Sequence, residues 1–571
     1  MAPKVGVYVC HCGINIAHTV DVEEVAKATA EVANVAVARN YIYMCSDPGQ
    51  QLIQDDIREL GLDRVVVASC SPRMHELTFR RVIQEAGLNP YYLQIANIRE
   101  QCSWVHTDRE AATEKAKDIV AGAVSRACLL QPLEERDTEV TPSALILGGG
   151  IAGLQAALEI ADAGYEAHVI EKEAALGGHI AHLTNTFPTL ESVPSLLTEV
   201  LERVQTHPRI EVLTHSRVVD VDGFIGNFQV QVETLPGDAD TPTATELTVG
   251  AIVVATGFDN FDATLKPEFG YGTYDRVITG PELEKLLARA DGPDTSSLLG
   301  SDEIEDVVFI QCVGSRDRNG GNPYCSRVCC MYTAKQAYLL RQMLPDSRIT
   351  VFYMDVRAFG KGFEQFYDQV RGQRVLYRRG NPSEIYRRQS KLVVRAEDTL
   401  LGKPIEVEAD LVVLATGLVP RQDANDTSTL LKLSRSEDGF FMELHPKLRP
   451  VETTSDGVFL AGCCQSPKDV TDTIAQAKAA ASSALIPLSL GKVRVESITC
   501  SVDQLLCSGC GLCAEACVYG ALTLNERTGI MTANQVLCKG CGACATACPS
   551  GAIVLRHFTP DQILAEIEGA V

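Results

Sequence analysis

Short apolar runs alternate with segments of helical periodicity over the first part of the chain. Apolar runs fall at residues 4–9, 64–69 and 91–95, and helical spacing of apolar residues separates them, for example around Val22. Strands that alternate with amphipathic helices are typical of a parallel sheet with helices on its faces. Residues 1–140 are therefore predicted to form a small α/β domain.

The next apolar run, at 143–147, leads into a glycine-rich turn, a helical segment and another apolar strand at 166–170. The turn fits G-x-G-x-x-G, whose glycines allow a tight turn, approach to a pyrophosphate and close packing of helix on strand. Glu171 ends the second strand, about where a carboxylate that binds ribose belongs. We predict a dinucleotide site formed by Gly148, Gly150, Ile151, Ala152, Gly153, Glu171 and Lys172, followed by Gly177, Gly178 and His179.

Two nearly identical apolar strands, 251–257 and 410–417, each end in Ala-Thr-Gly, and a third run, 456–462, ends in Ala-Gly. With the glycine loop, this set resembles the thioredoxin-reductase type of flavoprotein over residues 143 to about 485. The resemblance implies two dinucleotide-binding domains and bound FAD. The further FAD contacts that it implies are Ala255, Thr256, Gly257, Gly417, Gly462, Cys463 (where the family usually has Asp), Thr473 and Ile474.

The second dinucleotide domain departs from that family. After the strand at 306–311, where a glycine loop for NADPH belongs, the chain has Cys312-x12-Cys325-x3-Cys329-Cys330 and no redox C-x-x-C. We predict that a four-thiolate metal site replaced the nicotinamide site, because thiolates are the ligands of iron–sulfur clusters. The alternative is a set of unligated or redox-labile cysteines.

Composition narrows the class of function. The chain has 571 residues, 21 cysteines and a formal net charge of −23, which argues against nucleic acid and anionic membranes as partners. The start lacks a signal-peptide pattern, and no apolar run approaches the roughly 20 residues of a membrane span. We therefore expect a cytoplasmic protein in which clustered cysteines form metal centres rather than disulfides.

Residues 489–571 carry the strongest motif. Two C-x2-C-x2-C-x3-C runs are typical of a bacterial ferredoxin with two [4Fe-4S] clusters, in which the fourth cysteine of each run ligates the other cluster. One cluster is predicted on Cys507, Cys510, Cys513 and Cys548, and the other on Cys538, Cys541, Cys544 and Cys517. Cys500 is not expected to be a ligand. The helical tail from Thr559 is expected to pack on this module.

Cysteines also follow the strands of the first domain. The carboxyl ends of parallel strands share one edge of the sheet, where ligands bind. A further cluster is therefore predicted on Cys10, Cys12, Cys45 and Cys70, with Cys102 as a substitute ligand. The alternative is that they are ordinary small buried residues, as we expect for Cys128.

Two charged residues are candidates for catalysis. Lys335 follows Cys329 and Cys330 on the predicted helix, where its charge would favour anionic, reduced flavin. The alternative is a solvated surface lysine. Glu282 is a weaker candidate, because Pro281 and Glu282 also suit an ordinary helix start.

The combination of these parts resembles the A-type, iron–sulfur flavoprotein component of heterodisulfide reductase, and residues 9–13, 68–76 and 97–102 add to the resemblance. It implies FAD, several [4Fe-4S] clusters, and electron bifurcation between a two-electron donor, ferredoxin and a disulfide-reducing partner. It also implies B-type and C-type partner subunits of heterodisulfide reductase, an electron-input subunit (hydrogenase, formate dehydrogenase or NADH-oxidising) and a homodimer within a larger complex. Methanogen versions carry a second ferredoxin module inside the flavin domain, whereas residues 220–248 here suggest only a polar hairpin.

The resulting domain plan is a small α/β domain at 1–140, a thioredoxin-reductase-like α/β domain at 141–488 and an α+β ferredoxin domain at 489–571. The former NAD(P) subdomain is expected at about 262–400. Two other functions fit the parts. One is an NAD(P)H-dependent reductase of the type that feeds glutamate synthase, which the missing second glycine loop disfavours. The other is a non-bifurcating electron wire.

Overall fold

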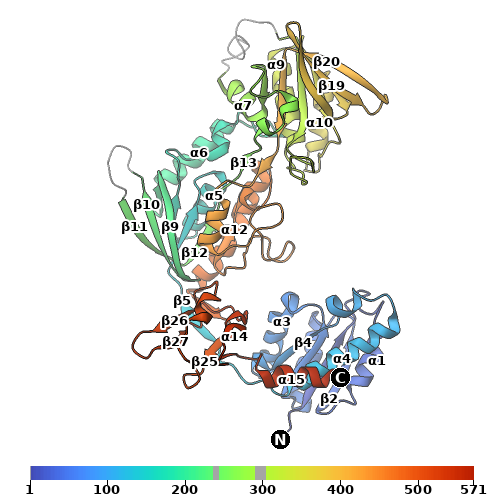
Figure 1. Ribbon diagram of the computed structural model, residues 1–571, viewed down its shortest axis with the longest axis vertical. Helices are drawn as coiled ribbons and strands as arrows, with labels where there is room; N and C mark the ends of the chain where they lie inside the picture. The colour runs from blue at the N-terminus through green and yellow to red at the C-terminus, as the bar shows by residue number, and fades with distance from the viewer. Residues whose placement is uncertain (1, 236–242, 290–303) are drawn as a thin grey trace. The chain divides into compact units, whose positions relative to one another are not determined.

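A computed structural model describes residues 2–235, 243–289 and 304–571 (Figure 1). The chain divides into two compact units, Met1–Asp137 with Arg494–Val571, and Thr138–Val493. The first and third predicted domains therefore belong to one unit. Residues 236–242 of the predicted hairpin and 290–303 of the former NAD(P) subdomain lie outside the described residues. Among the described residues, no helix has both the length and the apolar character needed to cross a bilayer.

The N-terminal part is the predicted parallel sheet with helices on its faces. Its four strands are parallel in the order β2-β1-β3-β4. Their bounds are β1 Val5–Cys10, β2 Val35–Tyr41, β3 Arg64–Ser69 and β4 Leu93–Asn97. The helices are α1 Val22–Thr29, α2 Asp47–Leu60, α3 Pro72–Glu85 and α4 Arg109–Ala127. Because the strands are parallel, the segments that follow them emerge at one edge.

The same unit contains the C-terminal part, which is built from two similar halves. Strand β25 (Cys500–Val502) pairs with β28 (Ile553–Leu555), and β26 (Leu522–Asn525) pairs with β27 (Ile530–Ala533), all antiparallel. Short helices α13 (Leu512–Glu515) and α14 (Ala543–Ala547) each begin inside a cysteine run. Arg80 of α3 forms an ion pair with Glu496 at 2.8 Å. This pair links the segment before the C-terminal part to a helix of the N-terminal part.

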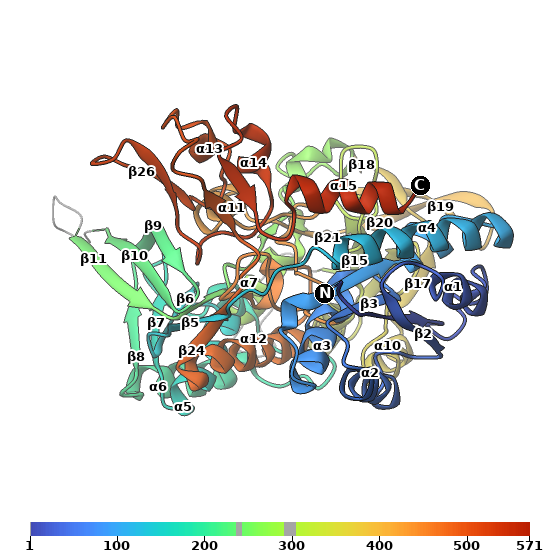
Figure 2. The same cartoon turned by 90° about the horizontal axis from the view of Figure 1, so that it is seen from below.

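The C-terminal helix α15 (Pro560–Gly569) lies along α4, as Figure 2 shows. The helices touch at Gly122, where an added Cβ would lie 2.5 Å from the carbonyl oxygen of Glu566. Arg126 of α4 also forms an ion pair with Glu566 at 2.8 Å. The expectation that this helix packs on the ferredoxin module is therefore wrong, because glycine on α4 offers it a closer partner.

The second unit repeats one plan twice, as the two-dinucleotide-domain fold requires. The first sheet is parallel in the order β23-β12-β6-β7-β8. Its strands are β6 Ser143–Leu147, β7 Glu166–Ile170, β8 Ile210–Leu213, β12 Ala251–Val254 and β23 Val458–Leu460, with helices α5 Ile151–Asp162, α6 Val193–Thr206 and α12 Val470–Leu490. An antiparallel meander follows, formed by β9 Ser216–Phe224, β10 Asn227–Thr234 and β11 Thr243–Val249.

The second sheet has the order β14-β21-β15-β16-β17, again parallel. Its strands are β14 Val277–Thr279, β15 Asp306–Val313, β16 Arg348–Tyr353, β17 Leu376–Arg379 and β21 Leu411–Thr416, with helices α7 Gly280–Arg289, α9 Cys329–Met343 and α10 Phe363–Gly372. Its meander is β18 Pro382–Arg388, β19 Lys391–Asp398 and β20 Lys403–Ala409. The predicted α/β class and repeated architecture are confirmed. Where a polar hairpin was predicted at 220–248, the structure has the three strands β9 to β11.

Candidate flavin and iron–sulfur sites

The glycine loop between β6 and α5 has the shape that a pyrophosphate site needs. Gly148 has a φ of +112°, and a Cβ on Gly153 would lie 1.9 Å from the carbonyl oxygen of Gly148. Among the described residues, and apart from the adjoining backbone, no heavy atom lies within 4 Å of the Cβ position of Gly150. The loop is thus tightly packed at Gly153, whereas Gly150 faces unfilled space in which a nucleotide fits.

Two substitutions separate these roles. Gly150→Ala meets no protein atom and keeps an extended backbone, so we expect an unchanged thermal midpoint but roughly tenfold weaker FAD binding, about 1.4 kcal/mol. In Gly153→Ala the added methyl group collides with the carbonyl of Gly148. We therefore expect a lower thermal midpoint and weaker FAD binding. The flavin-to-protein ratio and the thermal midpoint of each variant check this. Equal flavin content in Gly150→Ala and the unchanged chain would contradict it.

Other predicted FAD residues surround this loop. The buried Glu171 accepts a hydrogen bond from the backbone N–H of Gly149 at 2.7 Å, so it also fixes the loop. Gly177 donates to the carbonyl of Gly149 at 2.8 Å. A Cβ on Gly462 would lie 2.8 Å from the Cβ of Ala152 and 3.3 Å from the Cγ2 of Thr473, so the last strand and the start of α12 meet α5.

The remaining predicted FAD residues have other neighbours. His179 stacks on Phe258 with ring centroids 4.1 Å apart, and Lys172 pairs with Asp423 at 2.9 Å. Cys463 is buried, with its sulfur 3.9 Å from the hydroxyl of Thr473. Gly417 differs from the rest, because its Cβ position faces Ser315 and Ser326. Both serines lie in the segment that connects β15 to α9. The structure therefore places Gly417 with the four-cysteine site.

The connection from β15 to α9 brings Cys312, Cys325, Cys329 and Cys330 together. Cys312 lies within β15, Cys329 and Cys330 open α9, and Cys325 lies in the loop between. Cys329 interacts electrostatically with each of the other three thiols. The backbone N–H of Arg327 donates to the sulfur of Cys325 at 3.3 Å. Thiols from a strand end, a loop and a helix start thus converge where a nicotinamide loop was expected.

Burial sets the protonation of these thiols. Burial first, and then the nearby Cys330, raise the pKa of Cys312 to about 12. Burial also raises the pKa values of Cys329 and Cys330. Thiolates therefore need a positive partner here, which a metal centre supplies. Cys312, Arg316 and Arg327 also have φ values of +61°, +55° and +61°, a backbone conformation that costs non-glycine residues energy and gathers at functional sites.

The spacing of the cysteine sulfurs is wider than a single zinc ion needs. With zinc–sulfur bonds of about 2.3 Å, tetrahedral geometry brings sulfurs to about 3.8 Å from one another. In the described ranges, the sole group of three or more potential ligand atoms within 4.8 Å is Glu305, Asp306 and Asp410. Lys391 lies 3.0 Å from Asp306 and 3.4 Å from Asp410, and Arg348 also pairs with Asp306, so two cations already bind this acidic group. The cysteine groups suit larger, polynuclear centres.

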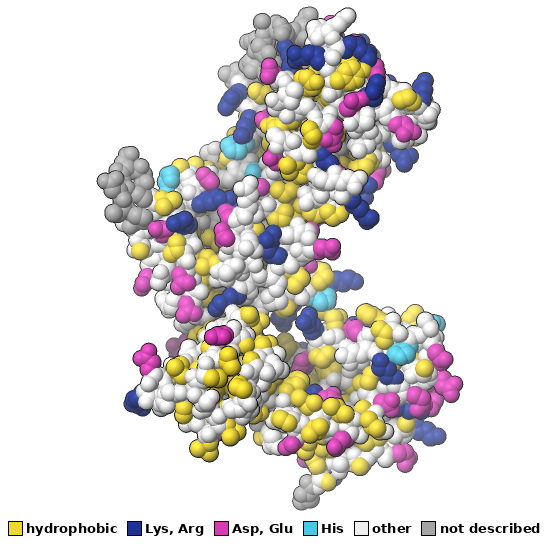
Figure 3. All heavy atoms as spheres, in the orientation of Figure 1, with side chains coloured by type: hydrophobic (Ala, Val, Ile, Leu, Met, Phe, Trp, Pro, Cys, Tyr) yellow, Lys and Arg dark blue, Asp and Glu magenta, His cyan; other side chains and the backbone are white. Residues whose placement is uncertain are grey.

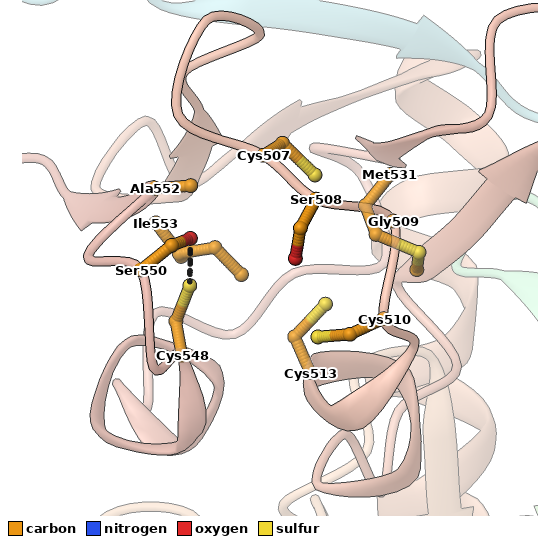
Figure 4. A pocket seen from close by; sticks show the side chains of 10 residues that line it. All are labelled: Cys507, Ser508, Gly509, Cys510, Cys513, Met531, Cys548, Ser550, Ala552 and Ile553. Carbon is orange, nitrogen blue, oxygen red and sulfur yellow. Dashed lines mark hydrogen bonds between the residues drawn. The ribbon is translucent and has the colours of Figure 1, made fainter.

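The ferredoxin part contains two hollows, each lined by the four cysteines predicted for one cluster. Figure 4 shows the sulfurs of Cys507, Cys510, Cys513 and Cys548 turned toward the space between them. The second hollow is lined by Cys538, Cys541, Cys544 and Cys517. The fourth cysteine of each run therefore lines the hollow of the other run, and the cluster ligation itself stays a prediction.

The second hollow also contains Cys500, which was not expected at a site. Its thiol and its backbone N–H both face the sulfur of Cys538, at 3.7 and 3.3 Å. These contacts lower the pKa of Cys538, with the thiol of Cys500 as the largest cause. The sequence contains one signal for this residue. Cys500 precedes the first cysteine run by the same number of residues as Met531 precedes the second, so the two occupy equivalent positions.

In the N-terminal part, Cys10, Cys12, Cys45 and Cys70 gather at the carboxyl edge of the sheet. The thiol of Cys10 interacts electrostatically with those of Cys12 and Cys45, and Cys70 interacts with Cys10 and Cys12. Arg99 donates to the sulfur of Cys12 at 3.4 Å. The structure does not bring Cys102 into this group, because its thiol donates to the carbonyl of Ala112 at 3.0 Å. Arg99 was missed because it lies outside the cysteine pattern.

We expect Cys12→Ala in the full chain to lower the iron content by about four atoms per chain, because one missing thiolate prevents assembly of a [4Fe-4S] cluster. Cys102→Ala is the matched control and is expected to leave the iron content unchanged. Iron analysis of anaerobically purified protein decides. If the two variants contain the same amount of iron, the prediction of an N-terminal cluster is wrong.

Lys335 is buried and not the solvated surface residue of the alternative. It is 2% exposed and pairs with the equally buried Glu284 at 2.7 Å. It also donates to the carbonyl of Asn185 at 3.0 Å. Burial lowers the pKa of Lys335, and Glu284 opposes that shift. Glu284 was missed although it occupies an apolar-face position of α7, beside the buried Leu283 and Leu287.

The contacts of Glu282 are those of the alternative, an ordinary helix start. Its carboxylate accepts hydrogen bonds from the backbone N–H and the hydroxyl of Thr279 at 2.7 and 2.8 Å, and from Tyr271 at 2.9 Å. These bonds stabilise the start of α7, as in an ordinary helix cap. Glu284, rather than Glu282, is the carboxylate that contacts Lys335.

Comparison with known proteins agrees with this geometry. Residues 142–286 match the family described as pyridine nucleotide-disulphide oxidoreductase, and residues 506–552 match the 4Fe-4S dicluster domain family. The chain is 47% identical to an A-type iron–sulfur component of the CoB--CoM heterodisulfide reductase of Methanopyrus kandleri, over 100% of this chain and 98% of the relative. It is 45% identical to the A-type component of the H(2):CoB-CoM heterodisulfide,ferredoxin reductase of Methanothermobacter marburgensis, over 100% and 97%.

Among solved structures, the thioredoxin reductase of T. acidophilum is similar over 61% of this chain and 98% of its own, with 16% identity and a TM-score of 0.40. The alignment with the Methanopyrus relative spans 647 positions, whereas this chain has 571 residues. At least 76 positions of that alignment therefore have no residue in this chain.

Proposed function

The chain belongs to the family of A-type heterodisulfide reductase components, and we propose that it is the FAD-containing member that splits electron pairs from a two-electron donor between ferredoxin and a disulfide-reducing partner. Members of this family are oxidoreductases that transfer electrons. The observation that carries the proposal is the convergence of Cys312, Cys325, Cys329 and Cys330 at the end of β15. A one-electron acceptor then takes the place of a nicotinamide in a flavoprotein fold.

The proposed cofactors are one FAD and four [4Fe-4S] clusters. FAD supplies two-electron chemistry, and the open front of Gly150 with Glu171 behind it suits the nucleotide. Soft thiolate ligands suit iron–sulfur clusters. The ligand sets are the two in the ferredoxin hollows, the set after β15 and the set at the N-terminal sheet edge. Lys335, held by Glu284, is proposed to keep a positive charge beside the reduced flavin.

The proposed partners are B-type and C-type subunits, an electron-input subunit, ferredoxin and a second copy of the chain, all in the cytoplasm. Apolar side chains gather over the ferredoxin part, as Figure 3 shows. They include Leu505, Leu506, Leu512, Val518 and Leu524, which are 44–96% exposed. Such patches mark protein contacts. The name of the Methanothermobacter relative includes H(2), ferredoxin and the CoB-CoM heterodisulfide. This name supports a hydrogen-oxidising input subunit, ferredoxin and a disulfide-reducing subunit as partners.

A spectroelectrochemical titration of the flavin tests pair splitting. Splitting requires crossed potentials, in which the second electron enters the flavin at a much higher potential than the first. Reduction is therefore expected to proceed in one apparent two-electron step. The reduced-to-oxidised ratio would then change tenfold per about 30 mV. Two resolved one-electron steps, each near 59 mV per tenfold, would favour the electron wire. A flavin that never changes state would favour the wire as well.

A further inference from the structure

The two ferredoxin hollows differ at one equivalent position. Each cysteine run is preceded, seven residues before its first cysteine, by a residue that lines the opposite hollow. Before Cys507 that residue is Cys500, and before Cys538 it is Met531. Figure 4 shows Met531 at the first hollow. A methionine sulfur has no hydrogen to donate, whereas a thiol is a donor.

The fold fixes the donors of Cys500. The residue is 1% exposed and lies in β25, opposite Leu555 of β28. Its backbone N–H donates to the sulfur of Cys538 at 3.3 Å, and its thiol lies 3.7 Å from the same sulfur. The segment before it is packed tightly, because a Cβ on Gly540 would lie 2.4 Å from the carbonyl oxygen of Ile498. The thiol therefore cannot turn to solvent.

The first hollow has a side-chain donor that is more accessible to solvent. The hydroxyl of Ser550 lies 3.6 Å from the sulfur of Cys548, and Ser550 is exposed. Backbone N–H groups bond to sulfurs in both hollows, for example Ala521 to Cys517 at 3.3 Å in the second and Ala552 and Ile553 to Cys548 in the first. The buried side-chain thiol beside Cys538 is therefore what distinguishes the second hollow from the first.

We infer that Cys500 is a positioning residue whose thiol donates to Cys538 and raises the reduction potential of the second cluster. This inference rests on the ferredoxin clusters of the proposed function. Reduction adds one electron and thus negative charge, which hydrogen bonds to cluster sulfur stabilise. The proton stays on Cys500, and no bond to iron changes.

The test exchanges the two equivalent residues in the full chain. Cys500→Met gives the second hollow the residue of the first, and Cys500→Ala guards against misfolding. Cys500→Ser keeps a donor, and Met531→Cys gives the first hollow a thiol. The readouts are iron content and potentials from a redox titration followed by electron paramagnetic resonance.

We expect Cys500→Met and Cys500→Ala to keep their iron. At a fixed potential, the reduced-to-oxidised ratio of one cluster falls about tenfold in each, which equals a midpoint lower by about 59 mV. We expect Cys500→Ser to retain most of the original reduction potential of the second cluster. Met531→Cys is expected to raise the reduction potential of the first cluster. Unchanged potentials with full iron would overturn the inference. Loss of about four irons in Cys500→Ala would overturn it too, because Cys500 would then be a ligand. An unsubstituted chain without ferredoxin clusters would instead refute the proposed function.

Discussion

Replacing Cys325 with alanine is expected to remove about four iron atoms per chain while FAD stays bound. The other three thiols lie on β15 and α9, and a cluster that loses the loop ligand has no further cysteine from the same connection to replace it. The glycine loop belongs to the first sheet and does not depend on this site. Iron and flavin analyses of the same anaerobic preparation measure both quantities.

The control for this substitution is Cys464→Ala. Cys464 is buried in the same unit, but its thiol donates to the carbonyl of Val254 at 3.1 Å and belongs to none of the predicted cluster sites. We expect the control to keep all of its iron. If Cys325→Ala also keeps its iron, the four thiols are not cluster ligands and the proposed electron path loses its first step from the flavin.

Breaking the buried pair of Lys335 and Glu284 is expected to have the largest effect on stability. Lys335→Met leaves a carboxylate buried without its cation, which costs about 3–5 kcal/mol in comparable sites. For a body of this size the thermal midpoint would fall by roughly 10 °C. The hydrogen bonds that Thr184 and Gln336 donate to Glu284 do not compensate, because neutral donors do not replace a full charge. Thermal unfolding followed by circular dichroism measures the change.

Two further variants separate the charge effect from packing. Lys335→Met combined with Glu284→Gln removes both charges, and we expect it to recover most of the lost stability. Lys478→Met is the matched control, since Lys478 pairs with Glu159 at 2.5 Å at the surface, where it is 53% exposed. Such exposed pairs contribute about 1 kcal/mol or less. A midpoint for Lys335→Met equal to that of the control would contradict the account.

Features that depend on local spacing were predictable from the sequence. The glycine loop follows from the conformations that Gly148 and Gly153 must adopt within a few residues. The crossed cysteine runs follow from the short spacing that a cluster demands. Even the site after β15 was predictable, because a strand end and a helix start are adjacent in a parallel sheet.

Features that depend on packing between distant segments were not predictable. Nothing near Lys335 in the sequence indicates Glu284, which reaches it from another helix. The place of α15 on α4 depends on Gly122, far away along the chain. Cys500 was set aside because it lies outside the cysteine runs, and only the pairing of β25 with β28 brings it to Cys538.

Anaerobic mixing of the flavin-loaded chain with NADH or NADPH tests the central claim most directly, namely that this flavin exchanges electrons with iron-bound sulfur. The account predicts that the visible absorbance of the flavin is unchanged by either nicotinamide, whereas reduction of the clusters by a one-electron donor is followed by reduction of the flavin. Rapid and complete bleaching of the flavin by NADH or NADPH would contradict it.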